Sequence, residues 1–145
     1  MSFVMPPKIM PAKTLKTKIV LFQTPPSFGP ENSENLRKFF EKIERNYIFV
    51  WEPRGKWQSE QIEKICKELE LVHCVDPLKQ KSVVGKINYF RLHGFPGYNL
   101  YYKYGKEDFA KIKNACNRKI NYVMFNNLSM LKDAKRFKKF LKCGK

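Results

Sequence analysis

Five short apolar segments, each followed by a proline, a glycine or a pair of asparagines, recur along the chain and constrain its fold more than any other feature. Such segments are typical of strands that are buried on both faces. Most of them are separated by stretches whose apolar side chains repeat at helical spacing. The expected strands cover residues 18–23, 47–52, 71–76, 87–93 and 120–125.

Four amphipathic helices are expected between and after these strands, and Ser59 is expected to cap the second. Residues 77–86 are polar, basic and short, so we expect a loop there. The alternation predicts an α/β fold with a parallel sheet of about five strands. The apolar stripes comprise Leu36, Phe39, Phe40 and Ile43; Ile62, Ile65, Cys66 and Leu69; Phe109, Ile112 and Cys116; and Leu131, Ala134, Phe137, Phe140 and Leu141.

The length of 145 residues favours one domain. Residues 1–17 show no clear period, and we expect them to form an N-terminal arm in front of a domain over residues 18–145. No apolar run approaches the ~20 residues of a membrane span. Prolines and lysines interrupt the N-terminal segment, which argues against a secretory signal, although a basic leader remains an alternative.

Four cysteines, Cys66, Cys74, Cys116 and Cys143, are present, and no two form a C-x-x-C pair. This spacing excludes a zinc ribbon and a thioredoxin-type motif. We expect free thiols and a cytoplasmic protein.

The net charge of +16 comes from 29 Lys and Arg against 13 Asp and Glu, and it is concentrated in the second half of the chain. Residues 1–72 hold 12 basic and 9 acidic side chains, whereas residues 73–145 hold 17 and 4. This asymmetry favours a polyanionic partner such as nucleic acid, although a solvated lysine-rich surface is the alternative. The candidate nucleic-acid surface on the last helix consists of Lys135, Arg136, Lys138 and Lys139.

Polar side chains gather where each expected strand ends. Ligands of parallel α/β folds bind outside the carboxyl ends of the strands, and unpaired polar groups in apolar strands are costly. A binding site at this edge is therefore expected. Its candidate residues are Gln23, Glu52, Arg54, Asp76, Arg91, His93, Asn126 and Asn127.

The charged candidates suggest an anionic ligand. Arg54 and Arg91 suit phosphate or carboxylate groups. His93 can transfer protons near neutral pH, and Glu52 and Asp76 can act as base, orienting group or metal ligand. Structural alternatives remain open, namely an ion pair of Glu52 with either arginine and a turn role for His93.

The remaining candidates are amides or neighbours of the charged residues. Asn126 and Asn127 can donate hydrogen bonds to a ligand, or they can serve loop and cap roles. Side-chain alternation places Arg91 and His93 on one face of their strand. It also places His73 on the face opposite Asp76, so these two are not expected to be joint ligands.

No cofactor is implied by any motif, because Walker, dinucleotide-binding and nucleophile-elbow patterns are absent. A divalent metal on His93 with Glu52 or Asp76 has no diagnostic spacing to support it. The tyrosine-rich segment 95–104 can either stack on bases or sugars or pack over the end of the strands.

Five sequence strings in this order resemble the YecE-like family, also called domain-of-unknown-function family 72, with wording closest to archaeal members. The resemblance covers residues 18–142, and the strings are LFQTPPSF from residue 21, WEPRGKW from residue 51, HCVDP from residue 73, YFRLHG from residue 89 and VMFNN from residue 123. The resemblance implies a TIM-like (β/α) barrel related in architecture to endonuclease IV and xylose isomerase. It implies no settled activity, and its recurrent polar positions coincide with the eight strand-end candidates.

Family members are normally barrels of about 250 residues with a Gly-rich first strand, which this chain lacks. The resemblance therefore implies a partial barrel that begins before the fourth strand, with the sixth helix reduced to a loop. Five parallel strands cannot close a barrel. We expect a homo-oligomer or a separately encoded N-terminal portion as partner, or else a decayed gene product.

Two functional hypotheses follow. In the first, a partial barrel binds an anionic, phosphate-bearing ligand, with His93, Glu52 and Asp76 as catalytic residues if the protein is an enzyme, for example a phosphoesterase-like or other hydrolase. In the second, the chain is a non-catalytic basic subunit that binds nucleic acid or completes a barrel with a partner chain.

Overall fold

The computed structural model describes residues 16–143, and these form two compact units, residues 16–71 and 72–143, which are taken separately below. The expected N-terminal arm over residues 1–17 lies almost entirely outside the described residues.

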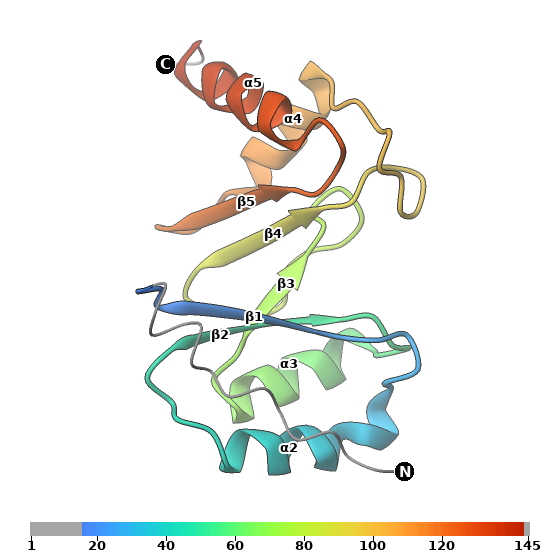
Figure 1. Ribbon diagram of the computed structural model, residues 1–145, viewed down its shortest axis with the longest axis vertical. Helices are drawn as coiled ribbons and strands as arrows, with labels where there is room; N and C mark the ends of the chain where they lie inside the picture. The colour runs from blue at the N-terminus through green and yellow to red at the C-terminus, as the bar shows by residue number, and fades with distance from the viewer. Residues whose placement is uncertain (1–15, 144–145) are drawn as a thin grey trace. The chain divides into compact units, whose positions relative to one another are not determined.

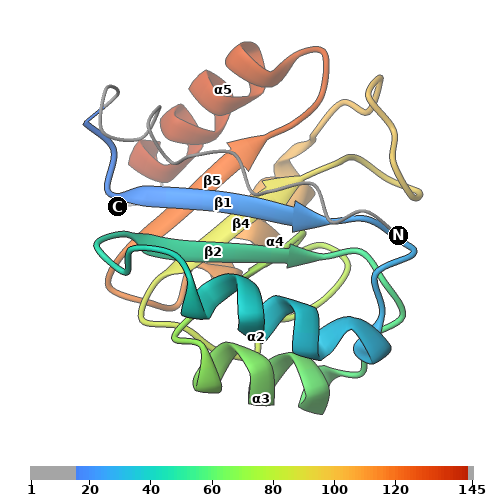
Figure 2. The same ribbon diagram turned by 60° about the horizontal axis from the view of Figure 1, so that its bottom comes forward.

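The first unit is a parallel strand pair with its helices on one face (Figures 1 and 2). The pairing runs without a bulge from Ile19 opposite Ile48 to Thr24 opposite Pro53. An ion pair between Arg37 and Glu68 joins the two α-helices at 2.5 Å. The elements are β1 (Ile19–Thr24), the 3-10 helix η1 (Pro30–Asn32), α2 (Ser33–Glu41), β2 (Ile48–Pro53) and α3 (Ser59–Glu68).

Aromatic side chains fill the space between this strand pair and its helices. Phe22 and Trp51 are register partners, and their rings stack at 6.5 Å. Phe40 of α2 packs against Phe22 at 5.1 Å. The indole N–H of Trp51 donates to the Thr24 hydroxyl at 3.1 Å, which satisfies a buried polar group. Strand alternation therefore places the next residues, Gln23 and Glu52, on the opposite face.

The second unit is a three-stranded parallel sheet in the order β3-β4-β5. Helices α4 and α5 both lie over the β4–β5 part of the sheet, on the same face (Figure 1). Leu92, Ile112, Phe125 and Phe137 form the centre of the core between them. The elements are β3 (Val72–Val75), β4 (Asn88–Leu92), α4 (Lys106–Ala115), β5 (Asn121–Phe125) and α5 (Met130–Cys143).

The connection from β3 to β4 contains no helix, as residues 77–86 predicted from their lack of an apolar stripe. A helix-free crossover leaves part of β4 covered by a loop alone, whereas α4 and α5 follow β4 and β5 in the usual way. This difference shapes the cavity described further below.

The predicted fold class is confirmed: parallel strands alternate with helices as in a partial α/β, TIM-like barrel. The predicted cap of α3 is wrong by one residue. The helix begins at Ser59 with Gln58 as its cap, where the backbone N–H of Gln58 donates to the Gln61 side chain at 2.9 Å. Among residues 16–143, none of the helices has the length and apolar character needed to cross a membrane.

Candidate functional site

Asp76 connects the end of β3 to the end of β4. Its Oδ2 accepts a hydrogen bond from the backbone N–H of His93 at 3.0 Å, and its Oδ1 accepts one from Leu78 at 3.1 Å. Both Asp76 and His93 are buried, with 7 % and 4 % of their surfaces exposed. Asp76 is therefore a positioning residue that fixes where His93 leaves its strand.

Asn126, at the end of β5, orients the His93 ring. Its amide nitrogen lies 3.1 Å from Nδ1 of His93. An amide NH₂ can only donate, so Nδ1 accepts and the neutral imidazole carries its proton on Nε2. The strand ends of β4 and β5 thus hold one tautomer of the His93 imidazole.

Tyr98, from the loop after β4, packs on the His93 ring with a centroid separation of 4.3 Å. Lys79 lies against both neighbours of His93: its Nζ is 3.6 Å from Asp76 Oδ2 and 5.5 Å from the centre of the Tyr98 ring. The charge of Lys79 and the exposed aromatic face of Tyr98 extend this site beyond the residues predicted from the sequence.

Arg91 lies two residues before His93 on β4, so strand alternation places both on one face, as predicted. Its register partner on β5 is Met124, which is exposed. Arg91 itself is half-buried. The face of the second unit that carries His93 therefore holds a guanidinium, and an anion is the ligand that such a group recognises best.

Gly94 allows the chain to turn directly after His93. Its φ is +80°, and a Cβ there would come within 2.1 Å of the Asn99 carbonyl oxygen. The backbone N–H of Gly94 donates to the buried Tyr104 hydroxyl at 2.8 Å, and the His93 carbonyl accepts from Asn99 at 2.8 Å. The backbone of His93 does serve a turn, while its ring belongs to the strand-end cluster.

Asn127 lies elsewhere in the second unit. Its amide donates to the Tyr102 carbonyl at 2.9 Å and to Asp133 of α5 at 2.8 Å. Oδ1 of Asp133 in turn accepts a hydrogen bond from Nη1 of Arg136 at 2.8 Å. Asn127 thereby joins the loop, the strand end and α5, while its proposed ligand contact stays a prediction.

The first unit carries its own strand-end cluster. Gln23 and Glu52 are register partners on the face opposite the aromatic core. Nε of Arg54 lies 3.4 Å from Glu52 Oε1. The ion pair of Glu52 with Arg54, one of the structural alternatives, is therefore present.

Close backbone approach fixes the turn that carries Arg54. A Cβ on Gly55 would lie 2.0 Å from the Phe28 carbonyl oxygen, and the same oxygen accepts the indole N–H of Trp57 at 2.8 Å. These contacts show that two of the family strings, at residues 21–28 and 51–57, pack against each other.

Strand alternation places His73 on the face opposite Asp76. Its Nδ1 accepts the backbone N–H of Val83 at 3.3 Å, and burial lowers the pKa of its imidazole to about 4. Its Nε2 has no hydrogen-bond partner among the described residues. His73 is thus a neutral core residue beneath the β3–β4 loop.

The predicted basic surface on α5 is exposed, and three of its members, Lys135, Lys138 and Lys139, make no ion pair with a described residue. Arg136 differs, because Asp133 and the Phe109 ring, 5.3 Å away, both hold it. Within residues 16–143, no three His, Cys, Asp or Glu side chains come together in a way that could hold a metal.

Sequence reasoning missed Lys79 and Tyr98. The sequence pointed only weakly to these two residues. Lys79 lies two residues after Pro77, and Tyr98 lies in the segment 95–104, for which two roles were predicted. Tyr104 packs in the core and Tyr98 packs on the His93 ring, as the packing alternative predicts, whereas stacking on bases or sugars stays a prediction.

The comparisons with known proteins identify the family. Residues 6–144 match the family described as "Protein of unknown function DUF72". The chain belongs to this family. The DUF72 match covers both units and all five strands, so it confirms the resemblance seen in the five strings, while the archaeal type and the absence of an N-terminal part stay predictions. Neither the comparison with curated proteins nor that with solved structures finds a match.

Proposed function

We propose that the strand ends of the second unit bind an anionic, phosphate-bearing ligand next to His93. The observation that supports this most directly is the orientation of the His93 ring, where Asn126 holds Nδ1 at 3.1 Å and leaves the proton on Nε2. An oriented N–H on the same strand face as Arg91 suits the acceptor oxygens of a phosphate.

In this proposal the cations Arg91 and Lys79 attract the negative charge of the ligand. His93 orients the ligand through a directional hydrogen bond. Arg91 supplies a planar donor pair on the same face as the imidazole. Lys79 supplies a point charge that Asp76 and Tyr98 keep near the ring. Tyr98 offers an aromatic surface to an organic part of the ligand.

In a hydrolytic reaction at this site, the Nε2–H of His93 would donate a hydrogen bond to a phosphate oxygen and stabilise the charge that develops there. Asp76 would act through His93 and not on the substrate, because both of its oxygens accept backbone N–H groups. Glu52 and Arg54 form a second strand-end pair with the same kinds of groups. The role of Glu52 as a base stays part of the prediction.

The test is binding and turnover with defined phosphates. Pyrophosphate binding is measured by calorimetry, and hydrolysis is measured with bis(p-nitrophenyl) phosphate, with and without divalent metal. We expect His93→Gln and Arg91→Gln to weaken pyrophosphate binding about tenfold or more. The matched control is Lys139→Gln, which removes the same charge from an exposed position on α5. Equal affinity in all four proteins would contradict the proposal.

A second candidate function is nucleic-acid binding through α5, favoured by the three exposed lysines without acidic partners, Lys135, Lys138 and Lys139. Such binding is electrostatic and falls steeply with salt. Neutralising these lysines together would reduce both affinity and salt dependence, and an unchanged salt slope would contradict it.

We also propose that a second copy of the chain covers the β5 edge. Among the described strands, β5 pairs with β4 alone and β1 with β2 alone, so two copies offer complementary open edges. Exposed apolar side chains gather around β5, at Ile120, Met124 and Leu128. Light scattering is expected to show a dimer or larger oligomer that Met124→Lys disrupts. A stable monomer, or assembly with a separately encoded chain only, would overturn it.

A further inference from the structure

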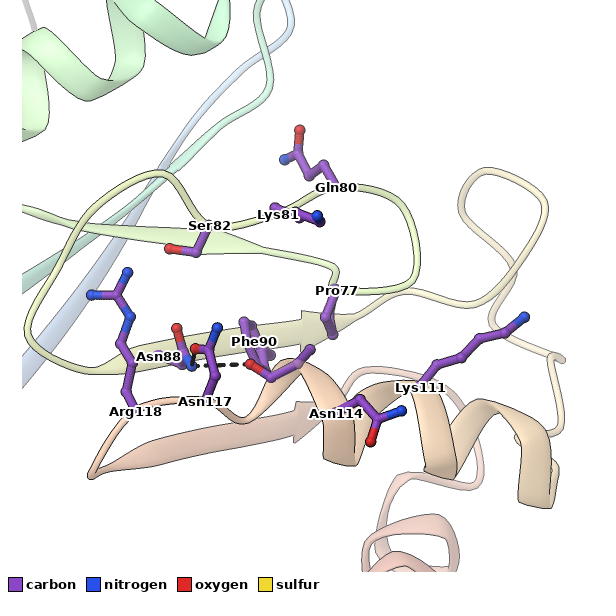
Figure 3. Close-up of a pocket in the computed structure, with 11 residues that line it drawn as sticks. Pro77, Gln80, Lys81, Ser82, Asn88, Phe90, Lys111, Asn114, Asn117 and Arg118 are labelled. Atoms are coloured by element: carbon purple, nitrogen blue, oxygen red, sulfur yellow. Dashed lines mark hydrogen bonds between the residues drawn. The ribbon is translucent and has the colours of Figure 1, made fainter.

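A cavity of about 490 Å³ lies in the second unit, between the β3–β4 loop, β4 and the C-terminal half of α4 (Figure 3). Gln80, Lys81 and Ser82 border it on the loop side, while Lys111, Asn114 and Arg118 border it on the side of α4 and the turn that follows. It is distinct from the strand-end cluster in every lining residue.

The missing crossover helix creates this cavity. In the other crossovers of the fold a helix packs over the strand, but here residues 77–86 pass over β4 as a loop. Asn88 and Phe90 form the strand side of the cavity. By alternation they point to the opposite face of β4 from Arg91 and His93.

The wall between the cavity and the start of β5 is built from asparagines. The Asn88 amide nitrogen donates to the Ala115 carbonyl at 3.2 Å, to Asn117 at 3.1 Å and to Asn121 at 2.8 Å. Asn88 is buried, and the network satisfies its amide and holds the turn after α4 in place. Arg118 extends from this ordered turn.

Three cations border the cavity without a counter-charge. Lys81, Lys111 and Arg118 form no ion pair with a described residue, and no carboxylate lines the cavity. Arg118 and Lys111 lie toward opposite ends of it, with Lys81 on the loop between them (Figure 3). Uncompensated like charges around one concavity favour a bound anion with more than one charged group.

The cavity is also lined by side-chain amide groups that can form hydrogen bonds with a polar organic ligand. The side chains of Gln80 and Asn114 have no hydrogen-bond partner among the described residues. A volume near 490 Å³ falls in the range of small-ligand sites and exceeds what a lone phosphate needs. Cations for phosphate and amides for a base or sugar match the chemistry of a nucleotide.

We propose that this cavity, named here the loop–α4 cleft and lined as above by Lys81, Lys111 and Arg118, binds a nucleotide unit through its phosphates. The unit is either a free nucleotide or one residue of a single-stranded nucleic acid, since both present the same phosphate, sugar and base. This site is independent of His93 and of the α5 surface.

The test measures binding of two probes by fluorescence anisotropy at low ionic strength. One probe is a fluorescent adenosine diphosphate, and the other is a labelled dodecamer of thymidylate. The cleft variant is the triple Lys81→Gln, Lys111→Gln, Arg118→Gln. The matched control, which removes the same charge from exposed positions outside both basic sites, is Lys103→Gln, Lys132→Gln, Lys142→Gln.

We expect the cleft variant to lose about tenfold or more in affinity for at least one probe, while the control changes by about twofold or less. Loss of nucleotide binding assigns the free nucleotide, and loss confined to the dodecamer assigns the strand. Equal losses in the two triple variants, or no binding of either probe by the wild-type protein, would overturn the proposal. Circular dichroism verifies that both variants are folded.

Discussion

Asp76 accepts the backbone N–H of His93 at 3.0 Å, and this one hydrogen bond fixes the position of the candidate ligand-binding imidazole. The same carboxylate also accepts the backbone N–H of Leu78. The end of β3, the turn that follows and the end of β4 therefore depend on a single buried side chain.

Asp76→Ala is expected to destabilise the protein by about 2–4 kcal/mol, because two N–H groups lose a charged acceptor in a buried position. Asp76→Asn retains one acceptor oxygen, so we expect it to cost less. Urea unfolding followed by circular dichroism measures both. An Asp76→Ala protein within about 0.5 kcal/mol of wild type would show that the carboxylate does not position the turn.

Asn127→Asp is expected to destabilise the protein more at pH 7 than at pH 4. The new carboxylate would lie at the 2.8 Å contact with Asp133, both groups would be buried, and like charges raise the pKa of one of them. A folded-state pKa above the unfolded value makes the penalty largest where the carboxylates are ionised. Asn46→Asp, at an exposed loop position, is the control. The same penalty at both pH values would contradict the buried contact.

The burial of His73 is expected to lower the free energy of unfolding in mild acid. Burial lowers the pKa of its imidazole from 6.5 to about 4. Between these two pH values the His73 side chain is protonated in the unfolded chain and neutral in the folded protein. The stability contributed by neutral His73 is complete above pH 6.5 and is lost as the pH falls toward 4, by about 3 kcal/mol in total.

The measurement for His73 is urea unfolding at pH 7.5 and pH 5. Wild type is expected to lose about 2 kcal/mol more than His73→Gln over this interval. Parallel pH dependence in the two proteins would contradict the burial of a neutral imidazole, and an NMR titration of the wild-type histidines gives the same answer without a variant.

The cysteines are expected to react in order of exposure. Burial raises the pKa of the Cys66 thiol to about 12, and Cys74 is buried as well, whereas Cys143 is exposed. Because the thiolate is the nucleophile, a disulfide reagent should modify Cys143 first and Cys66 only after unfolding. Cys143→Ser should remove the fast phase. Fast labelling that persists in this variant would contradict the order, and the cytoplasmic location expected from free thiols stays a separate prediction.

The sequence was sufficient for the elements and for which face each strand residue occupies. Apolar runs and terminating prolines placed β2 at 47–52 against the observed Ile48–Pro53, because both signals are local. Alternation separates His73 from Asp76 and places Arg91 on the same face as His93, since the side-chain period of a strand is two.

Interactions that depend on loop conformation were not accessible in this way. Tyr98 reaches His93 only because Gly94 adopts φ +80°, and Asn127 meets Asp133 only after α5 packs on the sheet. The loop–α4 cleft exists because a helix is missing, and a helix-free segment of sequence does not reveal which side chains line the space. Each of these features is set by tertiary packing, which periodicity does not encode.

The most direct test of the central claim uses the two histidines, His73 and His93, as separate reporters in one 15N-detected NMR experiment. Without ligand, both rings should show the Nε2–H tautomer, since Nδ1 accepts a hydrogen bond in each. On addition of pyrophosphate, the account predicts a saturable shift of the His93 signals while those of His73 stay in place. His93 signals that remain unmoved, or that move together with those of His73, would contradict a phosphate-binding site at the ends of β4 and β5.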